Sequence, residues 1–200
     1  MATLEFFFDC SSPWTYLAFT RVQPIAARTG AKIEWKPILV GGVFNTVNRD
    51  VYERRANPDP RKARYTAKDL QDWARLTGLK IIMPPPVFPV RATLAMRCAL
   101  AAQDEGKVIE FSRSCFHSYW SDSQDISLPD VLSAVCAAAK LNGERILARA
   151  QASEIKDRLR ANTDEVIARG GFGSPTMFVN GEDMYFGNDR MELVEAALRR

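Results

Sequence analysis

Two patterns of apolar residues organise the first forty positions. Residues 4–8 form a short, largely apolar run without regular alternation, which is typical of a strand buried on both faces. Apolar residues then recur at helical spacing, which predicts a helix from Pro13 to about Arg28, with Gly30 as its stop signal. Residues 32–36 alternate polar with apolar and predict a second strand. The segment therefore reads as a β-α-β unit with parallel strands.

The middle of the chain begins with a predicted loop and continues as helices. Residues 40–64 contain Gly41-Gly42, several asparagines and many charges, so we expect a loop with at most short helical pieces. A loop of that length in a compact domain tends to be functional. Ser127 to Asp130 resembles a capping box. Helical spacing predicts helices over 67–76, 91–103, 107–120, 128–136, 144–150 and 153–169.

The last thirty residues return to strand patterns. Residues 176–179 and 184–186 flank Asn180-Gly181, the strongest short hairpin signal. A final helix follows, with Asp189 as its expected cap. The order β-α-β, helical block, β-β-α predicts an α/β, thioredoxin-like fold with a large all-helical insertion after the second strand. We expect one unit over 1–200, with a core of 1–40 and 171–200 and an insertion of about 65–170.

Composition removes several classes of function. A hydrophobic content of 46% suits a globular chain, and Lys plus Arg exceeds Asp plus Glu by only three, 27 against 24. The basic residues are scattered, so nucleic acid is not an expected partner. No apolar run has membrane-spanning length and no secretion signal is recognisable, so a cytoplasmic protein is expected. The four cysteines are widely spaced and indicate neither a metal site nor a disulfide framework.

Ser12 is the sharpest candidate for chemistry. It precedes Pro13 at the start of the first helix, so its hydroxyl lies at the positive end of the helix dipole, where an anion is stabilised. The plainer interpretation is a helix cap alone. Ser11 is a rival hydroxyl, and Cys10 could itself become a thiolate beside the same terminus. His117 is the only histidine and has no triad partner nearby in sequence.

Five stretches together carry a resemblance to a known family: residues 8–18, Asn57-Pro58 with Lys62 and Tyr65, residues 69–74, residues 173–178 and residues 186–190. With these motifs, the chain resembles the 2-hydroxychromene-2-carboxylate isomerases and the related kappa-class glutathione transferases. Both belong to the disulfide-oxidoreductase branch of the thioredoxin superfamily. The resemblance extends over essentially the whole chain.

The resemblance implies that glutathione supplies the reactive sulfur. Where redox relatives carry Cys-Pro-x-Cys, this chain has Ser12-Pro13-Trp14-Thr15, so dithiol exchange at that position is excluded. Ser12 would stabilise the glutathione thiolate. The implied reaction is isomerisation of a small aromatic carboxylate, a 2-hydroxychromene-2-carboxylate, in which glutathione returns unchanged. The resemblance also implies a homodimer.

Further site residues follow from the same resemblance. Ser174-Pro175 matches a cis-proline turn whose backbone faces the cysteinyl amide of glutathione, and Ser174 stands where isomerases usually place an aliphatic residue. Arg91 departs from a frequent asparagine and would suit a substrate carboxylate. Asn57, Arg91, Asp189 and Trp14 each also have a structural interpretation, as turn, solvated arginine, cap and packing residue. The expected glutathione-binding residues are Ser12, Ser174, Pro175, Phe186, Gly187, Asn188 and Asp189, and the expected substrate residues are Asn57, Arg91 and Trp14.

Three other functions stay open from the sequence. A kappa-type transferase would leave glutathione attached to its electrophile. A non-catalytic thioredoxin-fold binding protein would show no glutathione affinity. A thiol oxidoreductase would act through Cys10. The sequence leaves the natural substrate and the role of Arg91 open.

Overall fold

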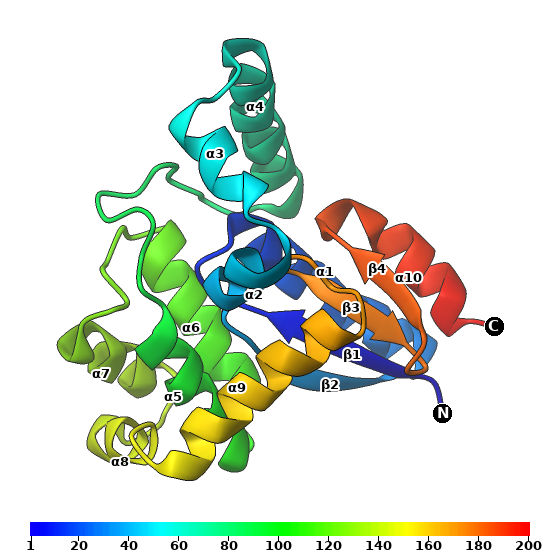
Figure 1. The fold of residues 1–200 in the computed structure, drawn as a ribbon. Coiled ribbons are helices and arrows are strands. Elements are labelled where there is room, and N and C mark those ends of the chain that lie inside the picture. The colour runs from blue at the N-terminus through cyan, green and yellow to red at the C-terminus, as the bar shows by residue number, and fades with distance from the viewer.

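The structure, a computed structural model, describes residues 1–200 and is built on a four-stranded sheet (Figure 1). The two inner strands are antiparallel to each other, and each pairs with one outer strand. The first pair of strands is parallel and the last is an antiparallel hairpin, as the sequence predicts. In spatial order the strands are β2 (Lys32–Pro37), β1 (Thr3–Phe8), β3 (Thr176–Val179) and β4 (Asp183–Phe186).

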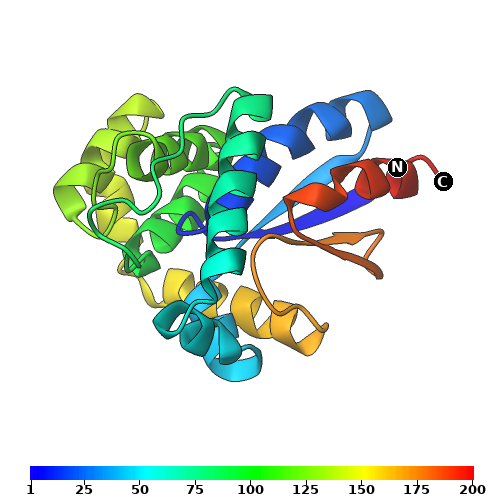
Figure 2. The same ribbon diagram turned by 90° about the horizontal axis from the view of Figure 1, so that it is seen from above.

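Helices cover both faces of this sheet (Figure 2). Helices α1 (Pro13–Thr29) and α10 (Met191–Leu198) pack on one face, and α9 (Ser153–Ala168) lies on the other. Successive phenylalanines of β1 point to opposite faces of the sheet. Phe8 packs against Phe19 of α1, with ring centroids 6.3 Å apart, whereas Phe7 clusters with Val166 of α9. Burial on both faces explains why β1 shows no polar alternation.

The insertion forms a helical cluster beside the sheet, and aromatic residues join it to α1. Phe116 stacks on Tyr16 with centroids 5.1 Å apart. The indole N–H of Trp120 donates to the carbonyl of Cys10 at 2.9 Å. The cluster is thereby fixed directly behind the start of α1. Its helices are α5 (Thr93–Asp104), α6 (Val108–Trp120), α7 (Pro129–Ala138) and α8 (Gly143–Arg149).

The predicted loop over 40–64 is wrong, because this stretch is almost entirely helical. It holds α2 (Val40–Val47), α3 (Asp50–Ala56) and the start of α4 (Pro60–Thr77). Val40 and Val43 are buried one helical turn apart, and the Asp59 carboxylate caps α4 by accepting from two backbone N–H groups. In Figure 1, α3 and α4 stand out from the rest of the molecule.

Two predicted caps are also wrong. At α7 the N-cap residue is Leu128, whose apolar side chain cannot accept a hydrogen bond, and the Ser127 N–H donates to the Asp125 carboxylate at 2.9 Å. At the C-terminus a short 3₁₀ helix, Asn188–Arg190, precedes α10, and Asp189 pairs with its neighbour Arg190 at 3.4 Å. None of the helices combines the length and apolar character needed to cross a bilayer.

Candidate active site

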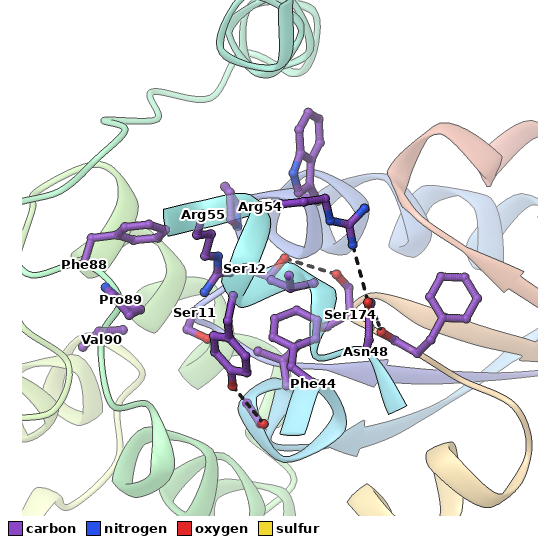
Figure 3. A pocket seen from close by; sticks show the side chains of 18 of the residues that line it. Ser11, Ser12, Phe44, Asn48, Arg54, Arg55, Phe88, Pro89, Val90 and Ser174 are labelled. Atoms are coloured by element: carbon purple, nitrogen blue, oxygen red, sulfur yellow. Dashed lines mark hydrogen bonds between the residues drawn. The ribbon is translucent and has the colours of Figure 1, made fainter. Parts of the chain in front are cut away.

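A cavity of about 660 Å³ lies where the start of α1 meets α2, α3 and the ends of the hairpin strands (Figure 3). Its size lies within the range of roughly 300–1,000 Å³ typical of small-molecule sites. The turn before α1 supplies polar groups, and aromatic rings supply much of the rest. It is lined by Ser11, Ser12, Pro13, Trp14, Val40, Gly41, Phe44, Asn48, Val51, Tyr52, Arg54, Arg55, Met83, Phe88, Pro89, Val90, Phe172, Gly173, Ser174 and Phe186.

Ser12 has the predicted position at the N-terminus of α1. Its hydroxyl oxygen accepts from the backbone N–H of Thr15 at 3.2 Å, which makes it the N-cap, and Pro13 takes the first helical position. The hydroxyl proton is donated to the carbonyl oxygen of Ser174, also at 3.2 Å. With 9% of its surface exposed, Ser12 meets the cavity at the positive end of the helix dipole.

Ser174 holds the other side of this contact. The peptide bond between Ser174 and Pro175 is cis, as the resemblance implies. The Ser174 hydroxyl accepts from the Asp9 backbone N–H at 3.0 Å and pairs with the Thr15 hydroxyl at 2.8 Å. The side chain of Ser174 is thus engaged in hydrogen bonds to Asp9 and Thr15, and its backbone carbonyl faces Ser12.

Asp9 ties the turn before α1 to α2. One carboxylate oxygen accepts from both the N–H and the hydroxyl of Ser11, each at 2.8 Å, and the other accepts from the Val40 N–H at 2.8 Å. Burial raises the pKa of the Asp9 carboxyl, although these hydrogen bonds act in the opposite direction. Because Ser11 already donates to Asp9, the hydroxyl facing Ser174 is that of Ser12.

Cys10 is a core residue, as its strand-end position suggests. It is fully buried, and burial, followed by a hydrogen bond with Cys115, raises the pKa of its thiol well above the usual value. It therefore lacks the access and the ionisation that a reactive cysteine needs. His117 is exposed on α6, 3.4 Å from the Asp122 carboxylate and outside this cavity. All four cysteines are free and buried.

Two arginines in the cavity were missed by the sequence analysis. Arg54 and Arg55 project from α3 toward the cavity (Figure 3), and neither forms an ion pair. The Arg54 guanidinium donates to the Asn48 side chain at 3.5 Å. Arg55 lies over the ring of Phe44 at 5.5 Å and over that of Phe88 at 5.7 Å. The cavity therefore has a positive wall made partly of cation–π contacts.

The sequence does carry a signal that the stretch before these arginines is helical. Val40, Val43, Phe44, Val47 and Val51 recur at intervals of three and four, the spacing of a helix face. The glycines and asparagines between them outweighed that signal in the sequence analysis. Because helices α2 and α3 were not predicted, the sequence did not indicate that the side chains of Arg54 and Arg55 face the cavity.

The sequence-predicted site residues divide into three groups. Four of them line the cavity: Ser12, Trp14, Ser174 and Phe186. Two more, Pro175 and Gly187, directly follow the lining residues Ser174 and Phe186. The Gly187 N–H donates to the Pro175 carbonyl at 3.1 Å. Four lie outside its lining: Asn57, Arg91, Asn188 and Asp189.

The residues outside the lining have structural surroundings of their own. Asn57 ends α3 and is exposed, and Arg91 is exposed just after the lining residue Val90. Asn188 is buried, and its carbonyl accepts from Arg21 at 2.6 Å, while its side-chain nitrogen has no partner in the protein. Roles for these residues in binding stay predictions.

Comparisons with known proteins agree with this architecture. The 2-hydroxychromene-2-carboxylate isomerase of Pseudomonas putida is 29% identical, covering 98% of this chain and 94% of its own length. Glutathione S-transferase kappa 1 of Homo sapiens is 27% identical, covering 96% and 88%. A solved 2-hydroxychromene-2-carboxylate isomerase superposes with a TM-score of 0.80 at 24% identity, covering 98% of this chain and 94% of that one.

The family itself is shown over nearly the full length. The model of the DSBA-like thioredoxin domain matches residues 3–199, from the first strand to the end of the last helix. The sheet order, the helical insertion and the cis-proline turn facing the start of α1 all lie within that range. This chain is therefore a member of the DSBA-like thioredoxin domain family.

Proposed function

We propose that this protein is a glutathione-dependent isomerase of 2-hydroxychromene-2-carboxylate-type intermediates in aromatic degradation. One observation carries the proposal: the Ser12 hydroxyl, at the start of α1, opens onto a cavity whose other wall holds two arginines without ion pairs. The named relatives include both isomerases of this type and glutathione transferases. In this proposal, Ser12 would bind the sulfur anion of glutathione, and the two arginines would bind a substrate carboxylate in the same cavity.

Ser12 supports thiolate chemistry in two ways. Its hydroxyl can donate to a sulfur anion, and the dipole of α1 favours negative charge at the same point. Bound glutathione would supply the nucleophilic sulfur, which adds to the unsaturated substrate and leaves again after isomerisation. Because Cys10 is buried and no thiol lines the cavity, the protein's own residues hold and orient the sulfur but do not replace it.

The remaining glutathione contacts are proposed on the hairpin side. The Ser174 carbonyl, just before Pro175, faces the Ser12 hydroxyl, and Phe186 lines the cavity just before Gly187. We assign the γ-glutamyl end of glutathione to the turn that opens α10, formed by Gly187, Asn188 and Asp189. The Gly187 N–H already donates to the Pro175 carbonyl, so the N–H groups that follow it at the start of the helix would receive the carboxylate.

The substrate would lie on the α3 side. Arg54 and Arg55 are placed to bind its carboxylate, and Trp14, Phe44 and Phe88 offer apolar surface for its rings. Asn57 and Arg91 follow the lining residues Arg55 and Val90 by two positions and one. We therefore assign the carboxylate first to the two arginines, and keep Asn57 and Arg91 as outer contacts.

The test is a spectroscopic assay with matched variants of Ser12. The protein, glutathione and 2-hydroxychromene-2-carboxylate are mixed, and the ultraviolet spectrum of the substrate is followed. We expect Ser12→Ala to lower kcat/KM by about 100-fold or more, as loss of a charge-stabilising donor does. Ser12→Thr keeps the hydroxyl and should retain far more activity. Circular dichroism of each variant controls for the lost cap, which costs about 1 kcal/mol.

The same assay separates the other functions. A substrate that reacts while glutathione is regained supports isomerisation, whereas consumption of glutathione in proportion to product indicates a kappa-type transferase. If glutathione does not change the substrate's ultraviolet spectrum and calorimetry detects no glutathione binding, the result supports a non-catalytic binding protein.

We also propose a cytoplasmic homodimer. The four free cysteines suit a reducing compartment, since secreted proteins commonly oxidise them. Dimerisation rests on the family resemblance alone. Light scattering coupled to size-exclusion chromatography tests it directly, and a mass near 22.4 kDa would contradict it.

A further inference from the structure

A second cavity, of about 330 Å³, lies among α2, α5 and α9 and shares no residue with the first. Helix α2 separates the two. Its residues Gly42 and Thr46 line the second cavity, whereas Gly41, Phe44 and Asn48 line or border the first. At 100° per residue these two sets fall on opposite faces of the helix. The second cavity is lined by Leu39, Gly42, Thr46, Arg97, Lys156, Leu159, Arg160, Thr163, Asp164 and Ile167.

Three cationic side chains converge on this cavity without carboxylate partners. Arg97 of α5 forms no ion pair, and its Nε–H is buried with no hydrogen-bond acceptor in the protein. Lys156 and Arg160 also form no ion pair and lie one turn apart on α9, where like charges repel. By contrast Arg158, on the same helix, pairs with Asp104 at 2.6 Å.

The polar lining leaves little but positive donors for a ligand. The Thr163 hydroxyl accepts from the Leu39 N–H at 3.1 Å and donates to the Leu159 carbonyl at 2.8 Å. The Thr46 hydroxyl donates to the Gly42 carbonyl at 3.0 Å. Both hydroxyl protons are therefore engaged, and the remaining donors belong to Arg97, Lys156 and Arg160. A molecule rich in acceptors fits such a set of donors.

Charge defines the ligand further. Three cations and the single carboxylate of Asp164 give the lining a formal charge of +2, since three minus one is two. A dianion balances that charge, and phosphate oxygens match guanidinium and ammonium groups. Leu39, Leu159 and Ile167 add apolar surface to the same cavity. This combination accepts a phosphate group that carries a short carbon chain.

We propose that the cavity behind α2 is a binding site for a phosphate dianion, free or as a phosphate monoester. Arg97 of α5 and Arg160 of α9 would hold the phosphate oxygens through their guanidinium groups, and Lys156, one turn from Arg160, would add its ammonium group. The site is separate from the candidate active site and does not depend on the function proposed for it.

Isothermal titration calorimetry at constant ionic strength, adjusted with sodium chloride, tests this site. The probes are sodium phosphate and glycerol 1-phosphate. We expect wild-type protein to bind phosphate, and the double variant Lys156→Gln/Arg160→Gln to bind it at least tenfold more weakly. Both substituted side chains reach the surface, so the fold should survive, and circular dichroism checks this. Tighter binding of glycerol 1-phosphate than of phosphate identifies a monoester; equal binding identifies free phosphate.

Two controls keep the site distinct from the other positive surfaces. Arg64→Gln removes one exposed positive charge from α4, and Arg54→Gln/Arg55→Gln removes two from the first cavity. Both should bind phosphate as wild type does. The proposal is overturned if wild-type protein does not bind either probe, if the Lys156→Gln/Arg160→Gln variant binds equally well, or if the Arg54→Gln/Arg55→Gln variant loses binding.

Discussion

At the scale of single residues, Phe7 shows how closely burial and sequence agree. It is fully buried, and its ring meets that of Phe178 edge-on, with centroids 5.7 Å apart. The apolar run of residues 4–8 predicted this burial from the sequence. Which ring would lie opposite it depends on the pairing of β1 with β3, and that pairing joins residues about 170 positions apart.

Phe7→Ala should lower the free energy of unfolding by about 3–5 kcal/mol, because it leaves a cavity in a small packed cluster. The partners in that cluster are Ile38, Val43, Val166 and Phe178, which come from several elements. Urea denaturation followed by circular dichroism measures the change. Leu193→Ala, at an exposed position of α10, is the control and should change stability far less. A loss below about 1 kcal/mol for Phe7→Ala would contradict this packing.

Glu5 should make stability depend on acid. Arg169 donates to both of its carboxylate oxygens, at 2.9 and 2.6 Å, and these bonds lower the pKa of Glu5. The unfolded chain, with a glutamate pKa of about 4.3, therefore binds the proton more readily than the folded protein. The stabilisation is complete above that pKa and is lost as the pH falls through the lower, folded-state value.

Unfolding free energies at pH 7 and pH 3.5 test this dependence. The difference between the two values should be smaller in Glu5→Gln than in wild type. Asp157, exposed on α9, forms no ion pair, so Asp157→Asn should leave the difference unchanged. An unchanged difference in Glu5→Gln would show that the Arg169 bonds do not favour the charged form.

At the scale of elements, local signals decided what the sequence could predict. Ser12, Pro13 and Gly30 marked both ends of α1, and the structure has this helix within one residue of the prediction. The Asn180-Gly181 turn likewise marked the hairpin. Helices α2 and α3 are short and start without a side-chain cap, and α2 contains two glycines, so the composition of this stretch resembled a loop. Packing against α9, a contact distant in sequence, stabilises α2 as a helix.

The start of α4 rests on one cap. Asp59 accepts from the backbone N–H groups of Arg61 and Lys62, at 2.9 and 3.2 Å. Asp59→Ala should cost about 1 kcal/mol, the usual value for a lost N-cap. Amide hydrogen exchange should speed up in the first turn of α4. Asp157→Ala, on an exposed helix position, should show neither effect. Unchanged exchange in Asp59→Ala would mean that packing alone holds this turn.

At the scale of the whole molecule, the order of elements allowed the sheet to be predicted. A β-α-β unit and a terminal hairpin predicted the parallel pair and the antiparallel pair, and the structure joins the two with β1 between β2 and β3. This order also brings Ser174 to Ser12 across 162 residues. The positive wall of the cavity could not be predicted in the same way. Arg54 and Arg55 reach the cavity because α3 lies over it, and nothing local in the sequence gives that placement.

One buried cluster of 45 residues joins the sheet to the helical insertion. Leu4 of β1 and Leu132 of α7 both belong to it. We therefore expect the chain to unfold in one cooperative step, as the single unit over 1–200 predicts. Far-ultraviolet circular dichroism and tryptophan fluorescence should give the same urea midpoint, since Trp35 and Trp120 report from strand and insertion. Two separate midpoints would divide the protein into independent parts.

The hydrogen bond from Ser12 to the Ser174 carbonyl sets a competition at the candidate active site. Any sulfur that is to receive the Ser12 proton must displace an acceptor already present at 3.2 Å. A neutral thiol is a weak acceptor and gains little by the exchange. A thiolate gains a charge-assisted hydrogen bond, which is about twice as strong as a neutral one. In the proposed reaction, Ser12 would thus favour the thiolate over the neutral thiol of the incoming glutathione.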